Sequence, residues 1–94
     1  MKRPTAVPTV QIDNNAVKVT EWRFPPGGET GWHRHAMDYV VVPQTTGPLV
    51  LETSNGDVTA QLTSGLAYFR PVGVEHNVVN PSEEDFVFVE IEIK

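Results

Sequence analysis

Residues 65–80 read GLAYFRPVGVEHNVVN, and this stretch decides most about the fold. Pro71-Val72-Gly73 at its centre predicts a turn, because proline restricts φ and glycine accepts positive φ. The flanking segments, Leu66 to Arg70 and Glu75 to Val79, alternate in character and are expected to be strands. The turn therefore delivers His76 near the start of the second strand.

A second stretch, residues 25–42, reads PPGGETGWHRHAMDYVVV and carries the other two histidines of the chain. His33 and His35 are two residues apart, so both imidazoles are expected on one face of an extended strand. These two and His76 are the only histidines in the protein. We therefore expect all three to form one site that binds a divalent transition ion, with Fe(II), Ni, Zn and Mn as candidates.

Alternation typical of β-strands recurs along the rest of the chain, and no helical apolar period persists over ten residues. Further strands are expected over residues 16–22, 32–43, 49–53, 58–62 and 85–94. Asn55-Gly56 lies between two of them and predicts a tight hairpin with positive φ at both residues. About eight short strands at roughly ten-residue spacing predict an all-β, antiparallel sandwich or barrel. Residues 1–12, which contain Pro4 and Pro8, are expected to form an N-terminal arm or an edge strand.

The two histidine-bearing stretches resemble the two signature motifs of the cupin family. The chain is identified as a small single-domain cupin of the cupin_2-like kind, with one domain over residues 1–94. The second motif matches at every fixed position, which are Gly65, Pro71, Gly73, His76 and Asn80. The first motif matches at Gly27, His33 and His35. The run GWHRHAMDYVVVP is also similar to small bacterial cupins linked to beta-alanine degradation. The resemblance implies an antiparallel jelly-roll β-barrel.

The first motif departs from the cupin pattern at its last ligand. Cupins usually carry a metal-binding Glu after three or four further residues, and those positions are Tyr39 and Val40 here. Because residues 33, 35, 37 and 39 share one strand face, Tyr39 is expected to point inward with the ligands and Met37 to line the cavity beside them. Asp38 has the opposite parity, and only a β-bulge would turn it inward.

A divalent ion held by three neutral histidines keeps its double charge, so the expected site suits an anionic ligand. Three-histidine Fe(II) sites occur among thiol and diketone dioxygenases of the cupin fold. The resemblance therefore implies a small metal-dependent oxidoreductase, dioxygenase-like, acting on a small carboxylate or thiol metabolite. In this hypothesis Tyr39 orients the substrate and Arg70 pairs with its carboxylate, while no organic cofactor is bound. The alternative is a non-catalytic small-molecule binding or sensing module with a structural metal, which the missing carboxylate ligand favours.

Composition restricts the partners and the location. The 94 residues include 12 acidic and 7 basic side chains, with no basic cluster beyond Lys2-Arg3, so nucleic acid is not an expected partner. The longest apolar run, Val40 to Val42, is far too short for a membrane span. The chain has no cysteine, and its N-terminus lacks the apolar segment of a signal peptide. We therefore expect a soluble cytoplasmic protein.

The last segment suggests an assembly. Residues 85–94 alternate, which places four branched aliphatic residues on one face and two aromatic and two acidic residues on the other. The aliphatic face consists of Val87, Val89, Ile91 and Ile93, and the opposite face of Phe86, Phe88, Glu90 and Glu92. A strand of this kind needs cover if it lies at a sheet edge. The sequence therefore predicts a homodimer, whereas a central position in the chain's own sheet would suit a monomer.

Overall fold

The computed structural model describes residues 2–94, so Met1 of the expected arm over residues 1–12 lies outside the described residues. The described chain forms nine strands and no helix, which confirms the all-β prediction. Accordingly, none of these residues belongs to a helix with the length and apolarity needed to cross a bilayer. The strands are β1 (Val7–Asp13), β2 (Val17–Phe24), β3 (His33–Arg34), β4 (Asp38–Pro43), β5 (Gly47–Thr53), β6 (Gly56–Leu62), β7 (Tyr68–Arg70), β8 (Glu75–Val79) and β9 (Phe86–Ile93).

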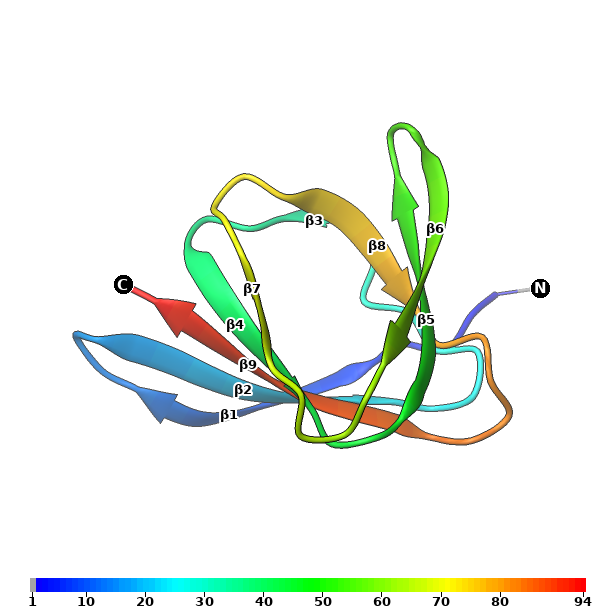
Figure 1. Cartoon of the computed structure of the whole chain (residues 1–94), viewed down its shortest axis with the longest axis horizontal. Coiled ribbons are helices and arrows are strands. Elements are labelled where there is room, and N and C mark those ends of the chain that lie inside the picture. The colour runs from blue at the N-terminus through cyan, green and yellow to red at the C-terminus, as the bar shows by residue number, and fades with distance from the viewer. Residues whose placement is uncertain (1) are drawn as a thin grey trace.

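The strands form two sheets that curve around a common interior, as Figure 1 shows. The five-stranded sheet has the order β1-β2-β9-β4-β7, and the four-stranded sheet has the order β3-β8-β5-β6. All pairings between these strands are antiparallel. The chain crosses repeatedly from one sheet to the other, so neighbours in space come from distant parts of the sequence. This arrangement agrees with the expected jelly roll.

Strand β9 lies in the middle of its sheet, between β2 and β4. The concern that this strand needs cover as a sheet edge was therefore unfounded, because both of its edges are paired within the chain. The edges of the sheet are β1 and β7 instead. Residues 7–13 of the N-terminal segment form β1, which pairs with β2 and is exposed along its whole length.

Apolar side chains from both sheets form a core in the space between them. Phe24 and Phe86 are almost completely buried, and the rings of Phe24 and Phe88 lie 5.4 Å apart between their centroids. Leu49 of β5 reaches the same core from the opposite sheet. The alternation of each strand brings these residues inward together. Leu49 and Phe88 of this core also line the cavity described below.

One turn and one strand differ from the expected geometry. In the β5–β6 hairpin only Gly56 has positive φ, at +106°, whereas Asn55 does not. Asn55 instead donates its backbone N–H to the hydroxyl of Thr53 at 3.1 Å, which stabilises the loop without a left-handed asparagine. The expected continuous strand over residues 32–43 is also wrong. It breaks at residues 35–37, so that β3 belongs to one sheet and β4 to the other.

Candidate metal centre

Two of the three histidines face each other across a strand pair. β3 and β8 pair antiparallel with His33 directly opposite His76. His35 follows β3 and is fixed by two backbone hydrogen bonds to the Pro71–Gly73 turn region. Its N–H donates to the carbonyl of Val74 at 2.9 Å, and its carbonyl accepts the N–H of Gly73 at 2.9 Å. Gly73 adopts φ +95°, so the turn does need a residue that tolerates positive φ, as the motif predicted.

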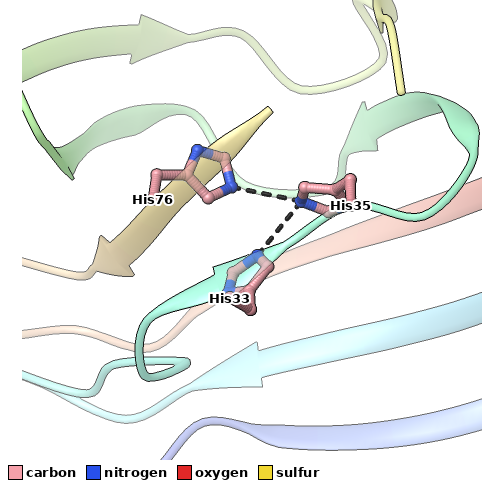
Figure 2. A group of neighbouring side chains, drawn as sticks. All are labelled: His33, His35 and His76. Atoms are coloured by element: carbon pink, nitrogen blue, oxygen red, sulfur yellow. Dashed lines mark hydrogen bonds between the residues drawn. The ribbon is translucent and has the colours of Figure 1, made fainter. Parts of the chain in front are cut away.

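The three imidazoles converge on one point, as Figure 2 shows. The Nε2 atom of His35 lies 3.0 Å from Nε2 of His33 and 3.2 Å from Nε2 of His76. One ligand atom from each ring lies within 4.8 Å of the others. An ion at about 2.1 Å from each of three nitrogens places them roughly 3.0–3.4 Å apart, depending on the coordination angles. Two of the three separations match this spacing, so the three histidines form a candidate site for a divalent transition ion.

The protonation of the rings also suits metal binding. The Nδ1 atom of His33 lies 2.8 Å from the carbonyl oxygen of Gly31, which can only accept, so this nitrogen carries the proton and Nε2 presents its lone pair to the centre. Burial, with a further contribution from His33, lowers the pKa of His35 and of His76 to about 4. These two rings are neutral at pH 7. Metal binding at that pH requires no proton to be displaced from them.

A hydrogen-bonded network behind His33 holds its loop in place. The side-chain oxygen of Asn77 accepts the N–H of Gly31 at 2.9 Å. The amide of Asn77 donates to the carboxylates of Glu29 and Glu52, at 2.8 Å each. Arg3 bonds to both of these carboxylates from the N-terminal segment. Groups that orient a metal ligand in this way tune its affinity. Sequence reasoning missed Asn77, although it directly follows His76 on β8.

Tyr39 and Asp38 lie on opposite sides of β4. The Tyr39 side chain is only 2% exposed, and its ring stacks on that of His35 with 3.9 Å between centroids. Burial raises the pKa of Tyr39, so the phenol stays protonated at neutral pH and is no anionic ligand. Asp38 is exposed, and its carboxylate accepts the N–H of Val72 at 2.7 Å. Asp38 therefore secures the turn that delivers His76 and does not contact the histidines.

The histidines line a cavity of about 450 Å³ between the two sheets. Arg70 and Arg34 also border it, whereas Arg23 pairs with Glu21 and Asp85 on the outer side. The guanidinium of Arg70 lies 4.6 Å above the centre of the Tyr68 ring. Met37 is not part of the cavity wall, contrary to expectation, because the strand breaks at this residue and loses its alternation.

One group of cavity residues was not anticipated as part of a site. Glu90 and Glu92 lie on the inner face of β9 and line the cavity together with Trp22 of β2. Glu90 is only 9% exposed. The signal was present in the sequence, because Glu90 and Glu92 continue the face of Phe86 and Phe88, and aromatic residues usually mark the buried side of a strand.

Comparisons with known proteins agree with this architecture. The sequence pattern of the cupin domain family matches residues 20–92. The beta-alanine degradation protein BauB of Pseudomonas aeruginosa is 66% identical over 92 residues, which cover 98% of this chain and 97% of that protein.

Solved structures give the same result. A cupin domain from Bordetella pertussis is 79% identical and superposes with a TM-score of 0.99, covering 100% of this chain and 98% of its own. A conserved protein with a double-stranded beta-helix domain from Klebsiella pneumoniae has a TM-score of 0.78 at 23% identity, over 95% of this chain and 76% of that one. At such low identity the second likeness shows the fold alone.

Proposed function

This chain belongs to the cupin family, and from that premise we propose that it is a metal-dependent, dioxygenase-like oxidoreductase acting on a small carboxylate or thiol metabolite. The observation that carries the proposal is the convergence of three imidazoles, 3.0 and 3.2 Å apart at their Nε2 atoms, on the wall of a 450 Å³ cavity. A cavity of this size suits a small ligand. His33, His35 and His76 would hold the ion.

The ligand set supports an anionic substrate. No carboxylate belongs to the group of potential ligands in residues 2–94, so three neutral rings would leave the ion its full double charge. When bound, such an ion supplies Lewis acidity and open coordination positions for an anion and for O₂. The name of the Pseudomonas relative, a beta-alanine degradation protein, supports a small metabolite with a carboxylate for this chain as well.

Two further side chains are proposed to act on the substrate. The protonated phenol of Tyr39, beside His35, can donate a hydrogen bond and so orient the substrate or a developing negative charge. Arg70 borders the same cavity and can pair with a carboxylate. Apolar residues of both sheets, such as Val41, Leu49 and Val78, complete the wall and limit the access of water.

Metal content is the first test of the proposal. Protein prepared without an affinity tag is analysed for transition metals beside the His76→Ala variant. We expect close to one ion per wild-type chain, a strong loss in the variant, and a higher melting temperature for the loaded wild type. Substoichiometric metal in both proteins, with the same melting temperature, contradicts the metal site.

Oxygen consumption tests the reaction. The protein is reconstituted anaerobically with Fe(II), Ni, Zn or Mn and then exposed to O₂ with a panel of small acids and thiols. We expect uptake of O₂ with Fe(II) and at least one member of the panel. The rival function, a binding or sensing module with a structural metal, is favoured by the stacking of Tyr39 on His35 in place of a fourth ligand. Tight binding without turnover for every metal supports that rival.

We also propose a cytoplasmic location, since the breakdown of small metabolites takes place there. Fractionation of cells that produce the protein, followed by immunodetection, tests this directly. Recovery of the protein with the periplasmic fraction contradicts it.

A further inference from the structure

The inner face of β9 carries carboxylates into the cavity. Side chains of this strand alternate between the two sides of the sheet, so Phe88, Glu90 and Glu92 follow one another on the inner face. Phe88 belongs to the packed core, and Glu92 is half-buried toward the chain end. Glu90 lies between them, 9% exposed and part of the cavity wall.

The charge of Glu90 is not balanced by an ion pair. Within residues 2–94, no Lys or Arg lies within 4.0 Å of its carboxylate. Burial, with a smaller contribution from Glu92, raises the pKa of Glu90 to about 7, although Lys18 and the Trp22 indole oppose the shift. A buried carboxylate without a countercharge is unfavourable, and a bound cation would remove that penalty.

The surroundings of Glu90 also suit a cation. The rings of Trp22, Tyr39, Tyr68 and Phe88 line the same cavity, and aromatic faces attract cationic groups. This part of the cavity therefore combines a buried negative charge with aromatic walls.

The distance to the histidines indicates a short ligand. In the pairing of β4 with β9, Tyr39 lies opposite Glu92 and Val41 opposite Glu90, so Tyr39 and Glu90 are diagonal neighbours. Diagonal neighbours on one face of an antiparallel pair are about 7–8 Å apart. Because the Tyr39 ring stacks on His35, one small molecule can reach from the histidine cluster to Glu90.

We propose that Glu90 and the aromatic rings around it form a subsite for a primary ammonium group, so that the ligand is a short amino acid with its carboxylate toward the histidines. The proposal rests on the function proposed above for the orientation of the ligand, whereas the ammonium subsite itself does not require the ion. The ammonium group supplies the missing countercharge of Glu90.

Calorimetric titration of the metal-loaded protein at pH 8 tests the proposal. The probes are 3-aminopropanoate, propanoate and the neutral analogue 3-hydroxypropanoate. We expect wild type to bind the amino acid at least tenfold more tightly than either other acid. In Glu90→Gln this preference should fall below twofold, with the affinity for propanoate unchanged. In the control Glu21→Gln, which changes a half-buried carboxylate on the outer side of the neighbouring strand β2, the preference should persist within threefold.

Two outcomes would overturn the subsite. One is an amine preference that survives in Glu90→Gln. The other is binding of 3-hydroxypropanoate to wild type as tightly as 3-aminopropanoate. This result would assign Glu90 a neutral hydrogen-bonding role, and it does not depend on how the variant folds.

Propylamine and metal-free protein separate the two proposals. Glu90-dependent binding of propylamine to metal-free wild type supports the subsite whether or not acids bind. Propanoate that binds metal-loaded and metal-free protein equally overturns the metal-centred function and leaves the ammonium subsite standing. The reverse pattern, with metal-dependent binding of propanoate and no binding of propylamine, overturns the subsite alone.

Discussion

At the scale of single residues, the neighbours Tyr39 and Asp38 contribute to the site in different ways. β4 alternates, so Tyr39 is buried against His35 while Asp38 faces outward and accepts the N–H of Val72. The histidine cluster consequently contains no carboxylate, and the acidic side chain supports a turn. The two substitutions below separate these roles.

We predict that Tyr39→Phe keeps the ion and changes ligand binding, whereas Asp38→Asn changes neither by more than about twofold. The phenylalanine keeps the stack on His35 and loses only the hydroxyl, and asparagine can still accept the bond from Val72. Elemental analysis and ligand titration of both variants check this. If Asp38→Asn loses its metal while Tyr39→Phe binds ligand normally, the carboxylate is a ligand after all.

Glu90 should make stability depend on pH in an unusual direction. Its pKa is about 7 in the folded protein against 4.5 for the reference group, so the folded state binds this proton more tightly than the unfolded chain. The stabilisation is present below pH 4.5 and is lost as the pH rises through 7. The groups that act on its pKa are Glu92, Lys18 and Trp22, and Tyr39 and Tyr68 lie beside it on the same face of the sheet.

We therefore predict that the unfolding free energy of wild type falls relative to that of Glu90→Gln by about 2.5 kcal/mol between pH 5 and pH 8. Urea titrations of both metal-free proteins at four pH values measure the difference. Titration of the histidines is common to both and cancels. A difference that does not change with pH would show that Glu90 titrates normally.

At the scale of elements, the turn before β8 links the fold to the histidine cluster. Gly73 has φ +95° and bonds to the carbonyl of His35, while a Cβ added there would lie 3.5 Å from Arg34. Gly56, in the hairpin between β5 and β6, has φ +106° and open space around it. The two glycines have similar backbone demands but different distances from the site in the fold.

We predict that Gly73→Ala and Gly56→Ala each destabilise the protein by about 1–3 kcal/mol, because both force a side chain into positive φ. Only Gly73→Ala should also weaken metal binding, by at least tenfold, since it displaces His35. Urea unfolding of the metal-free variants and competition with a chelator provide the two readouts. Equal metal affinity in both variants would mean that the turn does not position the ligand.

The elements also show why part of the site was predictable. The spacing of two residues predicted that His33 and His35 share one face, and the Pro71–Gly73 turn predicted the position of His76 after it. Tyr39 was predicted inward from an unbroken strand, but the strand breaks at residues 35–37. The orientation still holds because β4 alternates on its own, with Tyr39 and Val41 buried. Met37 lies within the break, and its predicted orientation failed for that reason.

Other parts of the site depended on pairing that the sequence does not specify. Alternation along residues 85–94 predicted the two faces of β9. That Glu90 faces a cavity follows from the position of this strand between β2 and β4, which alternation does not predict. Asn77 acquires its role through Glu29, Glu52 and Arg3, which come from three other segments. Such long-range hydrogen bonds have no local periodicity to reveal them.

At the scale of the whole molecule, the outer side of the five-stranded sheet carries an apolar row across its full width. Pairing in register aligns one outward residue from each strand, in the order Ile12, Val19, Ile91, Val40 and Phe69. Ile12 is 48% and Phe69 52% exposed at the two ends of the row. Although β9 is not an edge strand, its aliphatic face still contributes to an exposed apolar surface of the kind that marks interfaces.

We predict that a second copy of the chain covers this row. Light scattering should then give about 21 kDa for the wild type, twice the 10.4 kDa of one chain. The double variant Ile12→Lys with Phe69→Lys should be monomeric, because it places charge at both exposed ends of the row. The control Val58→Lys, at a 54% exposed valine on β6 of the other sheet, should remain dimeric.

A wild type of 10.4 kDa at micromolar concentration refutes the dimer, and a double variant that still dimerises places the interface elsewhere. If the wild type is monomeric, the row is stabilised only by its own cross-strand contacts, which the half-buried Val19, Ile91 and Val40 already provide.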